Sequence, residues 1–270
     1  MNDSNIIGAI LGTERVRLNL TISKLCNGLC SASTYNRYES GKMLPDKFML
    51  SALLERMGKN PNRIVYTVTD EEHLLLDIRK KIWESINQKN VESVRKYLYE
   101  YAQIPKIRSK RIHKQFEFGV KGEIYRLSGN PDGAINSYKE ALAQTISEKD
   151  YNDINDSLYT VLEFGLLFKI GEMKDYDLLF KLGYYLKRLS NDNYLKVVFY
   201  GDIIEELIRK SKDKWMKQMQ LEYIEDALQY KRMIKQSRGI VRLLELKRDC
   251  QGTLNPDEEI ISRMTGLLGC

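Results

Sequence analysis

A short polar segment, Ser31 to Gly41, holds the side chains with the most distinctive chemistry in this sequence. It reads SASTYNRYESG, with a serine where a helix N-cap is expected and a glycine where a helix would end. Asn36 and Arg37 can each form two parallel hydrogen bonds with a base edge, the Asn amide with adenine and the Arg guanidinium with guanine. Each such pair contributes about 1–3 kcal/mol of discrimination between bases. The segment therefore has the chemistry of a base-reading helix.

A second short helix is expected just before this segment. Residues 20–27 read LTISKLCN, with Thr21 as the cap, and Gly28-Leu29-Cys30 forms the turn that follows. A helix, a turn of about four residues and a second helix can place one helix across the DNA backbone and the next in the major groove. The inward-facing side chains would be Leu25, Leu29, Tyr35 and Tyr38. The exposed side chains would be Ala32, Ser33, Asn36 and Arg37.

Three segments carry a family resemblance: LGTERVRLNLT at 11–21, GLCSASTYNRYESG at 28–41 and MLSALLERMG at 49–58. They resemble the helix-turn-helix family of phage-repressor type, the XRE-like transcriptional regulators, which implies binding to double-stranded DNA. The family's base-reading positions fall on Ala32, Ser33, Asn36 and Arg37. Its phosphate contacts are expected near Thr21, Ser31, Lys42 and Lys47. The resemblance also implies a structural pair, Arg15 with Glu39, between the first helix and the recognition helix.

One departure from the family concerns the first position of the second helix. The family usually has Gln there, in contact with a phosphate, whereas this sequence has Ile22. Ser23 or the backbone amides of that helix start could replace the contact. The departure keeps a second hypothesis open, in which the front domain is a degenerate docking module of a protein-protein adaptor. If DNA is bound, the few basic contacts per domain favour a homodimer on a palindromic or repeated operator.

The rest of the chain must position this helix, and it reads as helical throughout. Apolar residues recur three and four positions apart through 70–86, 115–127, 157–170, 195–208 and 219–234, and we expect no strand. The interruption from Gly58 to Asp70 predicts a five-helix front domain, 1–66, and a body, 67–270. The 43 Lys and Arg exceed the 37 Asp and Glu, and residues 1–69 hold nine basic and five acidic side chains. This excess at the front suggests an anionic partner there.

The body contains one clear repeat unit, GEIYRLSGNPDGAINSYKEALAQT. Small residues such as Gly122 and Ala134 let two antiparallel helices approach, Tyr125 and Tyr138 fill the gaps, and Gly129-Asn130-Pro131 makes the turn. The unit resembles the tetratricopeptide repeat (TPR), and its neighbours look like degenerate copies. One hairpin cannot bury its apolar face alone, so we expect an all-α solenoid of stacked TPR-like hairpins. A final amphipathic helix would cap the solenoid or dock on a second subunit.

A repressor-like domain followed by TPR-like helices resembles the peptide-pheromone-sensing, quorum-sensing regulators of Gram-positive bacteria. The resemblance implies that the solenoid binds a short signalling peptide and mediates dimerisation. One set of four candidate side chains is expected on a single helix face: Asn152, Asn155, Tyr159 and Glu163. Two more, Glu123 and Arg126, fall where the first helix of the clear unit faces the groove. A solvated helix face is the alternative interpretation of such a polar stripe.

Other classes of function find little support in the sequence. His73 and His113 stand without a nucleophile or carboxylate at a telling spacing, so we expect no enzyme, no cofactor and no metal. The four cysteines have no disulfide or metal spacing, which suggests reduced packing residues. The start lacks the basic region of a signal peptide, and no run approaches 18 apolar residues. The predicted location is the cytoplasm, with no membrane partner.

Overall fold

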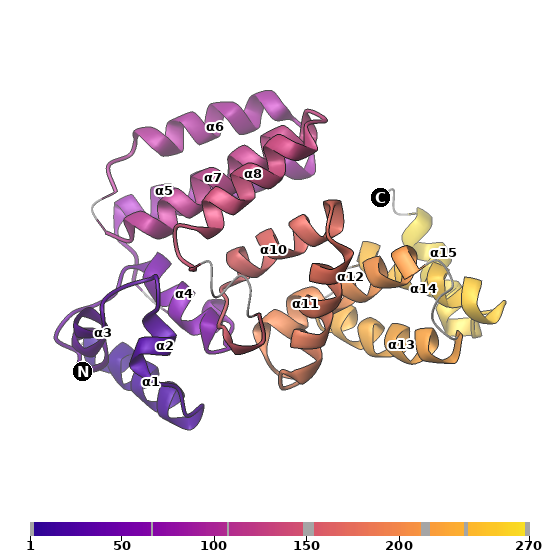
Figure 1. Cartoon of the computed structure of the whole chain (residues 1–270), viewed down its shortest axis with the longest axis horizontal. Helices are drawn as coiled ribbons and strands as arrows, with labels where there is room; N and C mark the ends of the chain where they lie inside the picture. Colours follow the sequence, from indigo (N-terminus) through magenta and orange to yellow (C-terminus); the bar gives the residue numbers. More distant parts are fainter. Residues whose placement is uncertain are drawn as a thin grey trace. The chain divides into compact units, whose positions relative to one another are not determined.

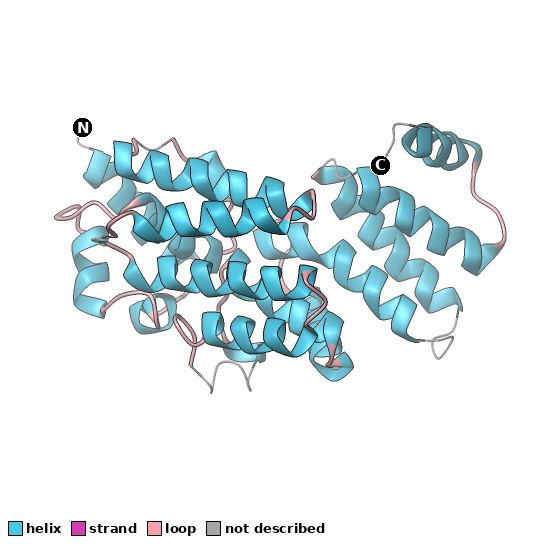
Figure 2. Cartoon of the chain, turned by 90° about the horizontal axis from the view of Figure 1, so that it is seen from above, coloured by secondary structure: helices cyan, strands magenta, loops and turns pink. Residues whose placement is uncertain are grey.

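The computed structural model describes residues 3–65, 67–106, 108–147, 154–211, 217–234 and 237–267. All regular elements in these ranges are helices, as Figure 2 shows, so the predicted all-α fold class is confirmed. Of the helices described, none combines the length and the apolar character needed to cross a membrane. The chain forms two compact units, Met1–Ile170 and Gly171–Cys270, which are described separately below. The predicted division after residue 66 falls inside the first unit and stays a prediction.

The first unit begins with helices α1 to α4 (Figure 1). They are α1 (Asp3–Arg17), α2 (Ile22–Cys26), α3 (Ala32–Glu39) and α4 (Lys47–Arg56), and the short 3-10 helix η1 (Pro61–Arg63) follows at the place of the expected fifth helix. The side chains of Thr21, Ser31 and Asp46 accept hydrogen bonds from backbone N–H groups in the first turns of α2, α3 and α4. Capping therefore fixes where each of these three helices begins.

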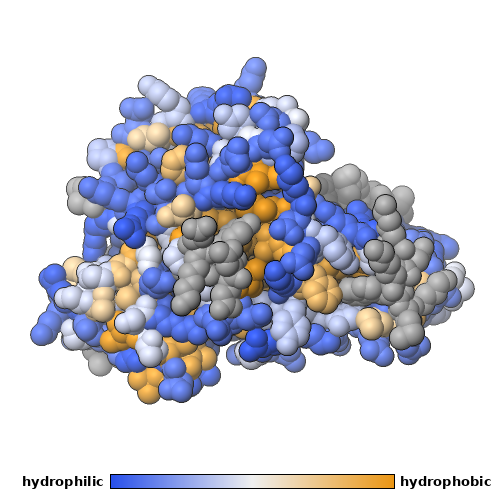
Figure 3. All heavy atoms as spheres, in the orientation of Figure 1, coloured by the Kyte–Doolittle hydropathy of each residue, from blue (hydrophilic) through white to orange (hydrophobic). Residues whose placement is uncertain are grey.

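Two antiparallel helical pairs follow, α5 (Asp70–Asn87) with α6 (Val91–Gln103) and α7 (Lys110–Leu127) with α8 (Pro131–Leu142). A capping box between Thr69 and Glu72 starts α5 at the expected position. The α7–α8 hairpin is the clear repeat unit, and a Cβ on Gly122 would lie 2.2 Å from the Tyr138 ring, so this close approach requires glycine. Hydrophilic residues dominate the outer face over α6 in Figure 3, as expected for amphipathic helices whose apolar sides pack inward.

The front helices and the first hairpin share one hydrophobic core. Phe48 of α4 packs against the His113 ring of α7 at a centroid distance of 4.5 Å, and the Arg79 guanidinium of α5 lies 4.4 Å from the Phe48 ring centroid. His113 is buried and its Nδ1 lies 2.5 Å from the Tyr101 hydroxyl. Burial lowers the pKa of His113 to about 3, so the ring is neutral at physiological pH. This histidine acts as a packing residue.

The next helix begins later than its periodicity predicted. After the short η2 (Ile154–Asp156), α10 (Val161–Met173) starts at residue 161, whereas the apolar pattern predicted a helix from 157. Thr160 and Glu163 form a reciprocal cap, with the Glu163 N–H donating to Thr160 Oγ1 (3.2 Å) and the Thr160 N–H donating to Glu163 Oε2 (2.7 Å). This T-x-x-E capping box stops the helix from extending backward.

The second unit consists of α11 (Tyr176–Arg188), α12 (Tyr194–Ser211), α13 (Lys217–Met233), α14 (Ser237–Gln251) and α15 (Pro256–Leu267). Each helix packs on the next in chain order, as in stacked helical hairpins. Two buried lysines are paired with carboxylates: Lys231 Nζ lies 2.6 Å from Asp202 Oδ1, and Lys247 Nζ lies 2.6 Å from Glu258 Oε1. The second of these pairs joins the expected terminal helix, α15, to α14.

Candidate nucleic-acid interface

The predicted recognition helix, α3, has one buried and one exposed side. Tyr35 and Tyr38 are 0% and 6% exposed, and Tyr35 donates from its hydroxyl to the carbonyl oxygen of Leu11 (3.4 Å). Burial raises the pKa of Tyr38 to about 12, so its hydroxyl stays protonated. The opposite side presents the four predicted base-reading side chains to solvent: Ala32, Ser33, Asn36 and Arg37. Whether they read bases stays a prediction, but the structure places all four on the accessible side.

The structure brings Arg15 and Glu39 together. Arg15 donates from Nε to Glu39 Oε2 (3.0 Å) and from Nη2 to Glu39 Oε1 (2.8 Å), a bidentate pair between α1 and the last residue of α3. Its third contact runs from Nη1 to the carbonyl oxygen of Leu20 (3.0 Å), just ahead of α2. One guanidinium therefore orients α1, α2 and α3 relative to one another, and the fixed fork geometry of arginine suits that task.

The predicted phosphate contacts occupy different environments. Thr21 and Ser31 are exposed N-cap residues, and Lys42 is exposed in the loop after α3. Lys47 is half-buried, and burial lowers the pKa of its ammonium against the opposing charges of Glu72 and Glu55. Of the four, Lys47 is the least available to a phosphate.

Ile22, the departure from the family pattern, packs partly buried against the hydrophobic core. Its side chain thus contributes to packing at the first position of α2, where the usual Gln would reach toward DNA. The neighbouring Ser23 is exposed. A polar contact from the start of α2 must therefore come from Ser23, the Thr21 cap or the backbone.

Arg56, near the end of α4, is a buried residue that sequence reasoning missed. It is 5% exposed, and it donates from Nη1 to the carbonyl oxygens of Leu25 (3.2 Å) and Asn27, at the end of α2. From Nη2 it donates to Glu163 Oε1 (2.8 Å) in α10. The signal was the helical phase: Arg56 lies four residues after Ala52, which is also buried. An arginine in the apolar phase of a helix indicates a buried partner.

The turn between α2 and α3 lies against the loop that follows α8. Gly28 has a φ of +71°, and a Cβ there would come 1.9 Å from the carbonyl oxygen of Thr145. Thr145 also donates from Oγ1 to Glu163 Oε1 (2.5 Å) and accepts from Arg56 Nη2 through its carbonyl oxygen (3.3 Å). Glycine is therefore required at position 28 for both its backbone conformation and this close approach.

The expected polar stripe on one helix face is not formed, and that geometric prediction was wrong. Asn155 lies in η2 and is exposed, but Tyr159 precedes α10 and is fully buried, and Glu163 is buried against Arg56. The fourth member, Asn152, lies outside the described residues. The Thr160–Glu163 capping box separates η2 from α10, so residues 155 and 163 do not share a helix.

The other two groove candidates, Glu123 and Arg126, belong to a charged cluster between α7, α8 and α10. Buried Glu123 accepts from Arg126 Nη2 (2.7 Å), from the Tyr138 hydroxyl (2.7 Å) and from Lys169 Nζ (3.0 Å). Burial alone would raise the pKa of Glu123, but Lys169, Tyr138 and Arg126 outweigh it and hold the pKa below its usual value. The side chains of Arg126 and Lys169 are 35% and 29% exposed, so two cationic groups border a buried carboxylate.

A second carboxyl group, Glu55 of α4, contacts the start of α10 and should make the stability of the fold depend on pH. Its Oε2 accepts from the Val161 N–H (2.9 Å). Burial raises the pKa of Glu55 to about 7; Glu163 adds to the shift, and Arg79 and Lys47 oppose it. Between about pH 4.5 and 7, the folded chain therefore holds a proton that the unfolded chain has released.

We expect the free energy of unfolding to fall as pH rises through this window, by an amount on the order of 2 kcal/mol, since one pKa unit corresponds to about 1.4 kcal/mol. Glu55→Gln, which mimics the protonated acid and keeps an acceptor for Val161, should flatten the change. Urea denaturation at pH 5, 6, 7 and 8 measures the free energy of unfolding at each pH, and Glu71→Gln, on the exposed face of α5, is the control. An unchanged pH dependence in Glu55→Gln would exclude Glu55 as its source.

Comparisons with known proteins find a family model and solved structures that are similar to this chain. Residues 11–64 match the family model described as Helix-turn-helix, which spans α2, α3 and α4. Among solved structures, Bacillus thuringiensis PlcR, determined in complex with the peptide PapR7 and DNA, matches over 97% of this chain and 94% of its own, with 14% identity and a TM-score of 0.50. The Streptococcus dysgalactiae SHP pheromone receptor Rgg2 matches over 97% and 92%, with 18% identity and a TM-score of 0.39.

A search of curated proteins gives no match to the sequence. The family match covers the front of the chain, and at 14% identity the likeness to PlcR concerns the fold. Residues 11–64 are thus similar to helix-turn-helix domains of XRE type, and the chain continues in TPR-like helical hairpins, in a fold similar to that of PlcR.

Proposed function

We propose that the protein is a sequence-specific, cytoplasmic transcriptional regulator whose helical body binds a short signalling peptide and mediates dimerisation. The observation that carries the DNA-binding part is the arrangement of side chains on α3. Its tyrosines are buried, its end is held by the Arg15–Glu39 pair, and its other side exposes Asn36 and Arg37. These two side chains fit adenine and guanine edges in the major groove.

Electrophoretic mobility shift with the DNA upstream of the protein's own gene tests this part of the proposal. A regulator should shift that DNA in the presence of excess non-specific competitor, and a methylation or footprinting assay should show a palindromic or repeated site. A protein-protein adaptor with a degenerate front domain would give no competitor-resistant complex. The same titration, followed by analytical ultracentrifugation, measures how many chains occupy one site.

The peptide part of the proposal is supported by the stacked helical hairpins and by the cationic rim of Arg126 and Lys169 around Glu123. A rim of this kind can bind the terminal or side-chain carboxylate of an extended peptide, while Asn155, exposed in η2, can pair with its backbone. PlcR, whose fold the chain shares, was solved with a bound peptide. In this proposal residues 1–66 read DNA and residues 67–270 sense the peptide and dimerise.

Isothermal titration calorimetry against short hydrophobic peptides encoded near the gene tests peptide binding. We expect the wild-type protein to bind one of them, and Arg126→Ala or Asn155→Ala to weaken it. Lys139→Ala, at an exposed position of α8, is the control. If no peptide binds, and Asn155→Ala regulates like the wild type, the proposed sensing role is wrong.

The contacts of Arg56 suggest how the signal would reach DNA. Because its guanidinium binds the carbonyl oxygens at the end of α2 and the carboxylate of Glu163 in α10, a displacement of α10 by a ligand would also move the end of α2 and the turn that leads into α3. A ligand that binds one placement of α10 better than another shifts the population of the corresponding DNA-reading geometry. In a dimer, this changes the spacing of the two recognition helices.

A further inference from the structure

The chain has a second concentration of basic side chains, in the segment that leads into α7. This basic segment, residues 106–114, contains Lys106, Arg108, Lys110, Arg111 and Lys114, and no Asp or Glu occurs between Glu100 and Glu117. Lys106 is paired with Glu117 at 3.1 Å, whereas the other four side chains are exposed. The segment thus presents four cations to solvent. Neither helix packing nor the proposed peptide site accounts for them.

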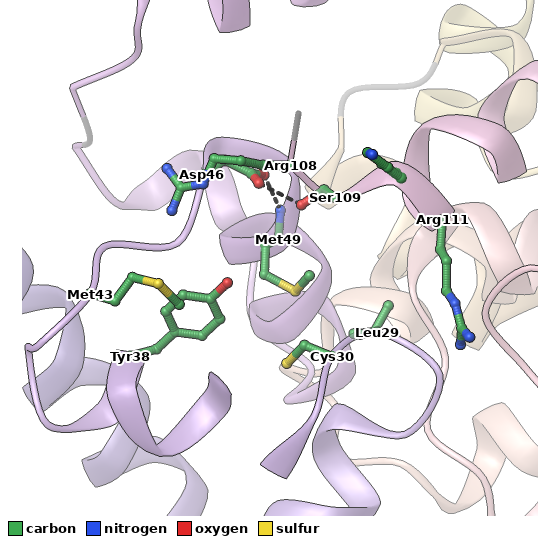
Figure 4. Close-up of a pocket in the computed structure, with 10 residues that line it drawn as sticks. Leu29, Cys30, Tyr38, Met43, Asp46, Met49, Arg108, Ser109 and Arg111 are labelled. Atoms are coloured by element: carbon green, nitrogen blue, oxygen red, sulfur yellow. Dashed lines mark hydrogen bonds between the residues drawn. The ribbon is translucent and has the colours of Figure 1, made fainter. Parts of the chain in front are cut away.

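The basic segment lies beside both loops that flank α3. The Arg108 guanidinium donates to the carbonyl oxygen of Leu44, in the loop after α3, and Arg111 Nη1 lies 3.5 Å from the carbonyl oxygen of Gly28, in the turn before it. Between the two arginines, Ser109 donates from Oγ to Asp46 Oδ2 (2.5 Å), the N-cap of α4. Figure 4 shows the two arginines extending in different directions from either side of Ser109.

A surface hollow of about 360 Å³ separates the basic segment from α3. Its lining includes Leu29, Cys30, Tyr38 and Met43 together with the cations Arg108, Lys110 and Arg111. All of these residues belong to the first compact unit. The contacts of Arg108 and Arg111 therefore place the basic segment beside α3, although it lies more than 60 residues further along the chain.

We infer that the basic segment is a second DNA-contacting surface, which binds backbone phosphates beside the major groove that α3 enters. The inference rests on the proposed DNA-binding function and extends the contact beyond residues 11–64. A helix in the major groove has a phosphate backbone on each side, so loops that flank α3 face those backbones. The front domain itself offers few exposed cations near α3, notably Arg37 and Lys42. Phosphate contacts supply sequence-independent affinity and fix the position of the protein on the duplex.

The salt dependence of DNA binding tests this assignment, because each neutralised phosphate steepens the plot of log affinity against log salt by about 0.9. For the double variant Lys110→Ala/Arg111→Ala, measured by fluorescence anisotropy on operator and on scrambled duplex, we expect a slope shallower by about 2. The affinities for both duplexes should fall by similar factors. Lys121→Ala/Lys139→Ala, which removes two exposed lysines from α7 and α8, should keep the wild-type slope.

A structural role for the basic segment gives a different result. If the cations only brace the loops around α3, the double variant should lose thermal stability or sequence preference while its salt slope stays as in the wild type, which would overturn the inference. Lys110→Ala/Lys114→Ala, on the exposed face of α7, removes charge without touching the Gly28 contact and should still lower the slope. If the wild-type protein binds DNA without sequence preference, but the double variant still lowers the salt slope, only the base-reading proposal is contradicted. No binding to any duplex would refute both.

Discussion

Replacing Arg37 by alanine is expected to weaken binding to the operator by about 5- to 150-fold, the equivalent of about 1–3 kcal/mol, and to relax the base requirement at one position. The guanidinium is exposed on α3, and its bidentate hydrogen bonds to guanine would be lost together. Fluorescence anisotropy with the operator, and with duplexes carrying each base at every position, gives both the affinity and the altered position.

The pattern across duplexes separates base reading from simple loss of charge. Lys42→Ala, at an exposed loop position expected to face a phosphate, should weaken all duplexes nearly equally and reduce the salt slope by about 1. Asn36→Ala should relax a different position from Arg37→Ala, because the two side chains are adjacent on α3. If Arg37→Ala weakens operator and scrambled DNA by the same factor, Arg37 contacts the backbone and does not read a base.

Local signals explain why so much of α3 could be predicted from the sequence. Ser31 caps the start of the helix, and Gly41 adopts a positive φ of 70° just after its end. Both ends of the helix therefore depend only on residues within four positions. The burial of Tyr35 and Tyr38 follows from helical periodicity, since they lie three residues apart on one side. The exposed side is then fixed by elimination.

In the region around α10, by contrast, the sequence-based predictions differ from the structure. The T-x-x-E motif that begins at Thr160 is a local signal for a helix start at residue 161, and in the structure it overrides the apolar periodicity that begins at 157. Glu163 was expected to face a ligand because it falls in a polar register. Its partner, Arg56, lies 107 residues away, and no local pattern reveals a contact at that separation. Only the packing of the front helices on the repeat helices determines it.

The same packing explains why the sequence alone does not place the basic segment beside α2 and α3. In sequence it belongs to the body, with Arg108 separated by 64 residues from Leu44. The shared core of Phe48, Arg79 and His113 holds α4 against α5 and α7, which brings the two regions together. A domain boundary drawn from Gly and Pro interruptions marks where helices stop, and says nothing of which helices pack together.

The Arg56–Glu163 pair should have the largest effect on stability. The two side chains are 2% and 0% exposed and their closest atoms are 2.8 Å apart. Removing either partner leaves an uncompensated buried charge, so Arg56→Ala and Glu163→Ala are each expected to cost about 3–5 kcal/mol. Replacing both by apolar residues of similar volume, Arg56→Met with Glu163→Leu, should recover most of that loss, since desolvating an ion pair is itself costly. Within the described residues, Arg56 Nε is buried without a hydrogen-bond partner, which adds to the cost of keeping the arginine.

Urea unfolding of the first unit can be followed separately. Trp83 of α5 lies 6.1 Å from Phe116, whereas Trp215, the second tryptophan, lies outside the described residues. In a Trp215→Phe background, fluorescence therefore reports the unit that contains the pair. A coupling energy near zero in the double-mutant cycle would show that the pair does not stabilise the fold.

The apolar double variant also separates stability from signal transfer. It keeps the packing between α4 and α10 but removes the hydrogen bonds that tie Glu163 to the end of α2. If the proposed coupling is right, this variant binds its operator and its peptide separately, while the peptide no longer changes operator affinity. An unchanged peptide effect would mean that the signal reaches α3 by another route. Because the coupling between two binding sites is reciprocal, the operator should also lose its effect on peptide affinity in this variant, whatever the variant's stability.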